Sequence, residues 1–156
     1  MAYENVNINK MRSALNKLDN IKSSSAKLDK LLEDLNPFWG ITWDSVTKQK
    51  IEDALITTKA CYNQIEKIID NGKLIANDIK EYQDLKDDND DYARKIKNLK
   101  NQKKLYSYSN SLTGGNSDSI KQKILKIEAD IKTYNNKINT NKNRMIVLQN
   151  QINGRM

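Results

Sequence analysis

The 156-residue chain has no histidine, one cysteine, one proline and five glycines. Without histidine it lacks the usual general base near neutral pH and the commonest metal ligand. No glycine-rich phosphate loop, nucleophile elbow or cysteine cluster is present either, and the single Cys61 cannot form an internal disulfide. We therefore expect a protein that is not an enzyme, that binds no metal or cofactor and that has no small-molecule substrate.

Long apolar runs are also missing. No run approaches the roughly 18 residues that a membrane-spanning helix needs, and the first residues, MAYENVNINK, lack the apolar core of a secretory signal peptide. The mean hydropathy of −0.83 suits helices that each bury one narrow stripe better than it suits a thick globular core. We expect a cytoplasmic protein, or one that is exported without a cleaved signal peptide.

Apolar residues recur every three or four positions along most of the chain, which is the spacing of a coiled-coil seam. The pattern predicts an all-α fold, a long antiparallel helical hairpin or coiled coil, with helices at about 4–35, 45–106 and 118–153. Pro37 ends the first helix because the residue before a proline avoids helical geometry. The Ser-, Asn- and Gly-rich segment 107–117 is a hairpin loop. The seam of the last helix, with one polar member, comprises Ile120, Ile124, Ile127, Ile131, Tyr134, Ile138, Asn141, Met145, Leu148 and Ile152.

Two places could interrupt the middle helix, at Gly72 in DNGK and at Asn89 in DDNDD. The apolar period does not reset at either place, so we favour one continuous helix with room for a bend. This gives two domains that share the middle helix. Residues 1–80 form a first helical hairpin, and residues 81–156 form a coiled-coil extension.

The net charge of +7 is unevenly distributed. Six acidic residues lie in segment 81–91, and six basic residues follow in segment 94–104. Opposite blocks in tandem favour a protein partner with long helices, or a second copy of the chain, over nucleic acid. Tyr106 and Tyr108 follow the basic run, but the neighbouring acids would repel phosphate. We do not expect membrane binding, because the basic face lacks bulky apolar residues opposite it.

The segment NPFWGITWDSV holds the only proline, the only phenylalanine and both tryptophans of the chain. These rings lie in the expected turn at 36–44, where Gly40 permits a tight reversal. They either close the end of the hairpin or anchor a partner, since tryptophan is common among the residues that dominate binding energy. The residues that we predict to form this turn and to bind the partner are Phe38, Trp39, Gly40, Trp43 and Ser45.

A Trp-Gly turn between two long amphipathic helices resembles the WXG/ESAT-like family of small secreted helical hairpins, which carries a Trp-x-Gly motif there. Two registers fit. Trp43-Asp44-Ser45 has serine at the glycine position, whereas Trp39-Gly40 lacks the spacer. The family's export motif, Tyr-x-x-x-Asp/Glu, is matched in its letters by Tyr62 and Glu66, although these lie in the middle of a helix.

The longer chain resembles the helical partner proteins of LXG-type toxins in Gram-positive bacteria. This resemblance implies a non-enzymatic partner or targeting factor, which binds such a toxin or a sibling helical protein for type VII secretion. Two alternatives stay open. One is a structural, self-associating coiled-coil protein of a phage or cytoskeletal assembly, and the other is a basic coiled coil that binds nucleic acid.

Overall fold

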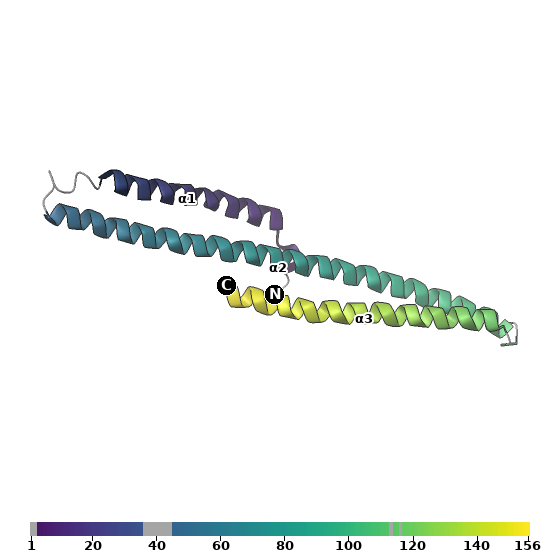
Figure 1. The fold of residues 1–156 in the computed structure, drawn as a ribbon. Helices are drawn as coiled ribbons and strands as arrows, with labels where there is room; N and C mark the ends of the chain where they lie inside the picture. Colours follow the sequence, from purple (N-terminus) through teal and green to yellow (C-terminus); the bar gives the residue numbers. More distant parts are fainter. Residues whose placement is uncertain (1–2, 36–44, 113, 116) are drawn as a thin grey trace. The chain divides into compact units, whose positions relative to one another are not determined.

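The computed structural model is all-α in the part of the chain that it describes, as the apolar periodicity predicts. A short 3₁₀ helix, η1 (Tyr3–Asn5), precedes three helices, α1 (Ile8–Leu35), α2 (Ser45–Leu112) and α3 (Asp118–Arg155) (Figure 1). α2 is one continuous helix, so neither DNGK nor DDNDD interrupts it. The structure describes residues 3–35, 45–112, 114–115 and 117–156.

α1 begins at Ile8, four residues after the predicted start at residue 4. Asn7 is the reason, because its side-chain Oδ1 accepts a hydrogen bond of 3.0 Å from the backbone N–H of Lys10. This is the geometry of a helix N-cap, and a residue in the cap position lies outside the helix. The residues before it are therefore free to form the separate turn η1.

α2 ends at Leu112, so the predicted loop at 107–117 is wrong over its first six residues. The helix ends where glycine becomes available: Gly114 and Gly115 have φ angles of 68° and 77°. Their backbone N–H groups donate to the carbonyls of Ser111 and Asn110, at 3.2 and 2.8 Å, as in a Schellman cap. The serines do not stop the helix, since Ser111 Oγ donates to the carbonyl of Ser107 one turn earlier.

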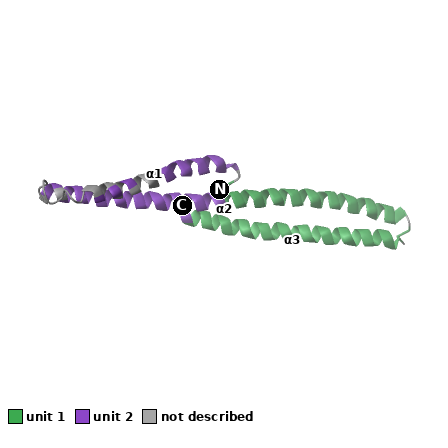
Figure 2. Cartoon of the chain, turned by 45° about the horizontal axis from the view of Figure 1, so that its top comes forward, with its two compact units in different colours: residues 1–4, 78–154, 156 green, residues 5–77, 155 purple. Residues whose placement is uncertain are grey.

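The chain divides into two compact units that share α2 (Figure 2). Unit 1, green in Figure 2, comprises residues 1–4, 78–154 and 156. Unit 2, purple, comprises residues 5–77 and 155. Tyr3 thus packs with the second half of α2 and with α3, whereas the sequence grouped it with the first hairpin.

In unit 2, α1 lies antiparallel to the first half of α2. Arg12 Nη2 donates to Asn77 Oδ1 at 3.0 Å, and one turn further along α1 the side chain of Leu15 reaches Gly72. The helices approach closely there because Gly72 and Ala76, one turn apart on α2, have little or no side chain. The fully buried Ile69 completes this contact region.

In unit 1, α3 packs antiparallel to the second half of α2, as predicted for the extension. The predicted seam positions of α3 are all buried or half-buried, and Leu148 and Ile152 have no exposed surface. α2 contributes Ile79, Tyr82 and Ile96 to the same core. The seam therefore follows the heptad pattern that the sequence displays.

Candidate functional site

The predicted turn motif falls almost entirely outside the described residues. Phe38, Trp39, Gly40 and Trp43 lie in segment 36–44, which joins the end of α1 to the beginning of α2. Ser45 is the first residue of α2. The roles proposed for these side chains stay predictions.

Tyr62 and Glu66 lie one turn apart on α2 within unit 2. Tyr62 is half-buried, as a seam position should be, whereas Glu66 is exposed. The helix continues from Glu66 to Leu112, so these two residues occupy the interior of a long helix. Their role in export stays a prediction.

The first half of α2 carries large apolar side chains that α1 does not cover. Val46, Ile56 and Ile68 are 61%, 68% and 62% exposed. Ile56 also lines a shallow, mainly apolar groove of about 250 Å³, together with three residues from neighbouring turns of α2. Those three residues are Glu52, Leu55 and Lys59. An apolar groove along one helix offers a place for a side chain of another helix.

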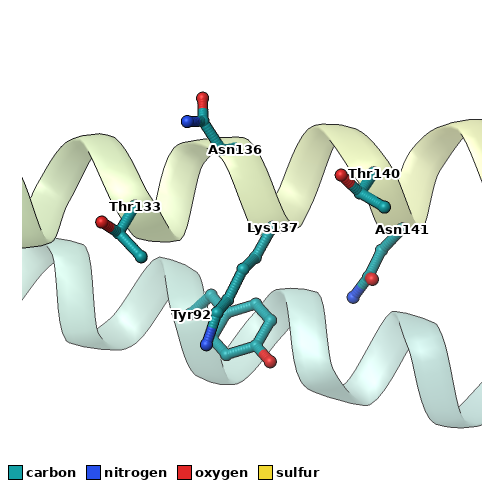
Figure 3. A pocket seen from close by; sticks show the side chains of 6 residues that line it. All are labelled: Tyr92, Thr133, Asn136, Lys137, Thr140 and Asn141. Carbon is teal, nitrogen blue, oxygen red and sulfur yellow. The ribbon is translucent and has the colours of Figure 1, made fainter.

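A second, more polar pocket of about 400 Å³ lies along unit 1 (Figure 3). Tyr92 from α2 stacks on Tyr134 from α3, with ring centroids 5.5 Å apart. Lys95 and Lys137 place their ammonium groups 5.4–5.8 Å from the centroids of both rings. Figure 3 shows the Lys137 side chain descending from α3 across the Tyr92 ring. Attraction between cations and aromatic rings thus links the two helices.

The residues that line this pocket are polar and come from both helices. Besides Tyr92 and Lys137 they are two threonines and two asparagines. Lys95, beside the pocket, is ion-paired with Asp91 at 2.6 Å. This hydrogen bond raises the pKa of Lys95 and lowers the pKa of Asp91, so both stay charged around neutral pH. The ring and cation contacts at this pocket link α2 to α3.

Further along unit 1, Arg144 of α3 forms a bidentate ion pair with Glu81 of α2. Arg144 Nε lies 2.7 Å from Glu81 Oε1, and Nη2 lies 2.9 Å from Oε2. The hydrogen bonds from Arg144 lower the pKa of Glu81. Such a bidentate geometry fixes the register of two helices as well as contributing energy.

Tyr3 is a contact residue that the sequence reasoning missed. Its ring is 7% exposed and meets the ring of Tyr82 edge-on, with centroids 5.6 Å apart. Its hydroxyl donates to Asn153 Oδ1 at 2.9 Å, and its backbone carbonyl accepts from Gln83 Nε2 at 2.9 Å. Tyr3 thus ties η1 to both helices of unit 1. The only sign of this contact in the sequence is that Tyr3 is an aromatic residue among polar neighbours.

The second feature that the sequence reasoning missed is an apolar stripe at the end of α2. Leu105, Tyr108 and Leu112 are 71%, 68% and 72% exposed and follow the i, i+3, i+7 spacing of one helix face. The spacing was visible in the sequence. The serines and the asparagine between these residues favour a loop, however. A loop has no helix face on which apolar residues could align.

The described residues contain no group of three or more His, Cys, Asp or Glu side chains that could hold a metal ion. None of the helices in the described ranges is both long and apolar enough to cross a membrane. Comparison with protein-family models, with curated proteins and with solved structures finds no match to this chain.

Proposed function

We propose that this protein is a non-enzymatic helical partner that binds a longer helical protein. Its resemblance to the partners of LXG-type toxins further suggests that the bound protein is such a toxin, or a sibling helical protein, destined for type VII secretion. The observation that carries the proposal is the exposed apolar surface on the first half of α2, beside the segment that contains both tryptophans.

The accessible surface supports a binding role. The chain exposes 11224 Å² to solvent. A compact protein of 18.0 kDa exposes about 8000 Å², so the excess is about 40%. Much of each helix is covered by one neighbour only, and a partner helix laid along α2 would bury part of the remainder. An apolar helix face covered by a partner helix is a recurrent mode of recognition.

In this proposal the partner binds along the hairpin of unit 2. Ile56 and Ile68, twelve residues apart on α2, would contact apolar residues of the partner, with Ile56 at the apolar groove. The rings of segment 36–44 would then extend the contact at the end of the hairpin. Large side chains that become buried at the centre of an interface contribute most of its binding energy.

The test is capture of a partner from the native cell with this chain, its identification by mass spectrometry, and co-expression of the two chains followed by mass measurement with light scattering. We expect a stoichiometric complex with the wild type. We expect a complex at least about tenfold weaker with the double variant Ile56→Ser, Ile68→Ser or with Trp43→Ala, because each loses apolar contact area. The matched control, Ile146→Ser with Val147→Ser, removes exposed apolar side chains from α3 and should leave the complex intact.

A chain that forms filaments or a stable homodimer alone, and that captures no helical partner, would establish the structural self-associating function instead. Circular dichroism of each variant separates loss of binding from loss of folding. If the double variant and Trp43→Ala both retain full helicity and full binding, the exposed apolar residues of unit 2 are not the interface.

A further inference from the structure

The hairpin end of unit 1 combines an uncharged tip with a dense set of lysines behind it. Segment 105–117, from the last turns of α2 to the residue before α3, contains no charged residue. Lysines flank it on both helices. On α2 they are Lys97, Lys100, Lys103 and Lys104, and on α3 they are Lys121, Lys123 and Lys126.

This end carries almost all the net charge of the protein. Segment 97–126 holds seven lysines and one acid, Asp118, a net charge of +6 out of +7 for the whole chain. Three of these lysines have partners: Lys103 pairs with Glu128, Lys121 pairs with Asp118, and Lys123 lies over the Tyr106 ring. The other four lysines are exposed, and an anionic surface could approach them without first breaking a described ion pair.

The uncharged tip exposes large apolar side chains. Leu105, Tyr108 and Leu112 form the stripe on α2, and Leu125 on α3 is 63% exposed. The seam that joins α2 to α3 here uses the half-buried Tyr106 and Asn110 instead. The stripe is therefore not needed to hold unit 1 together.

We propose that this tip binds the surface of a membrane that contains anionic lipids. Lys104 and Leu112 are eight residues apart on one helix, which places them about 12 Å apart at roughly 1.5 Å per residue. Interfacial helices bury their apolar faces about 5–10 Å into the boundary between headgroups and acyl chains. With Leu112 at that depth, Lys103 and Lys104 lie at the level of the lipid phosphates, and their flexible side chains reach them.

The arrangement favours a bilayer over nucleic acid. Phosphate neutralisation along a nucleic-acid strand requires cations at the contact, with rings for stacking. Here the tip is uncharged and carries the apolar stripe of Leu105, Tyr108 and Leu112, with lysines flanking it on both helices. A bilayer with anionic lipids offers an apolar interior to the stripe and an anionic layer to the lysines.

The sequence alone argued against membrane binding because no bulky apolar residues accompanied the basic face. The helix that continues to Leu112 removes that objection, since it aligns the three apolar residues on one face. Asp118 is an unfavourable group, because its side chain is 93% exposed at the tip and Lys121, at 3.5 Å, offsets its charge only in part. Its removal should strengthen binding.

The experiment is sedimentation of the full chain with vesicles of phosphatidylcholine alone and of phosphatidylcholine mixed with phosphatidylglycerol. We expect partition onto the mixed vesicles only, and weaker partition as salt rises from about 0.05 M to about 0.5 M. Leu105→Ser, Tyr108→Ser and Leu112→Ser together should weaken partition by at least about tenfold. Lys104→Gln should weaken it by about fivefold and Asp118→Asn should strengthen it by about fivefold, at about 1 kcal/mol per charge.

The double variant Ile146→Ser, Val147→Ser is the control, since it removes exposed apolar residues from a part of α3 outside segment 97–126. It should partition as the wild type does. Equal binding to neutral vesicles, no binding to mixed vesicles, or an unchanged partition of the folded triple variant would overturn the proposal. Salt-sensitive binding to a DNA duplex that the triple variant retains, without vesicle binding, would assign the lysines to nucleic acid.

Discussion

Gly72→Ala tests the close packing of α1 on α2 because two opposed effects meet at this position. Alanine in the interior of a helix is favoured over glycine by about 1 kcal/mol. An ideal Cβ at residue 72, however, would lie 2.5 Å from Leu15 Cδ2 and 3.4 Å from Leu15 Cδ1. Leu15 is only 8% exposed, so its side chain has little room to retreat.

In the wild-type background we expect the steric clash with Leu15 to outweigh the gain in helix propensity. Overpacking of a buried site costs about 1–3 kcal/mol, and the propensity gain offsets about 1 kcal/mol of this. We therefore expect Gly72→Ala to lower the free energy of unfolding of unit 2 by about 1 kcal/mol. In a Leu15→Ala background the clashing atoms are gone, and the same substitution should stabilise unit 2 by about 1 kcal/mol.

The assay is urea unfolding followed by tryptophan fluorescence, which reports on unit 2 because both tryptophans lie within residues 5–77. The double-mutant cycle should give a coupling of about 2 kcal/mol. If Leu15→Ala itself unfolds unit 2, the milder Leu15→Val takes its place. Gly154→Ala is the control, since nothing lies within 4 Å of its Cβ, and it should not destabilise the chain. Equal stabilisation by Gly72→Ala in both backgrounds would refute the close approach of the helices.

Three further outcomes follow from contacts within unit 1. Tyr3→Phe should cost about 1 kcal/mol through the lost hydrogen bond to Asn153, seen as faster amide exchange at the end of α3; unchanged exchange would contradict the contact. The folded pKa of Glu81 is lowered, so its contribution to stability is present above its unfolded pKa and is lost as pH falls through the folded pKa. Acid titration of stability should therefore become shallower in Arg144→Gln, and an unaltered slope would argue against the ion pair. Asn141 Nδ2 is buried and has no hydrogen-bond partner among the described residues, so Asn141→Leu should raise the free energy of unfolding by about 1–3 kcal/mol, as measured by urea unfolding. A loss of stability would show that the amide has a role in the seam.

The helices themselves could be predicted because their signal is local. The three-and-four spacing of apolar residues, Pro37 after the first helix and the glycine pair before the last one each act within a few residues of their own position. The predicted end of the middle helix was wrong because the local preference of its last residues for loop over helix was weak. Serines at positions 107, 109 and 111 suggested a loop, yet α2 continues until the glycines provide a left-handed cap.

The candidate site was less predictable than the fold. The sequence identified Tyr62 and Glu66 as a motif, but it offered no means of deciding which apolar residues of α2 would stay uncovered. Ile56 and Leu55 are adjacent in the chain and chemically alike, yet Leu55 is half-buried and Ile56 is 68% exposed. Their exposure depends on the side from which α1 approaches, and that is a property of the packed unit.

The sequence by itself determined that this chain forms three long helices, since periodicity, caps and glycines act over single turns. Only the tertiary structure decided through which residues α2 meets its two neighbours, α1 at Gly72 and α3 at Tyr92. It also decided that Tyr3 joins the unit formed by α3. The physical reason is that contacts between residues far apart in sequence depend on which faces meet, and many pairings of amphipathic helices satisfy the same apolar spacing.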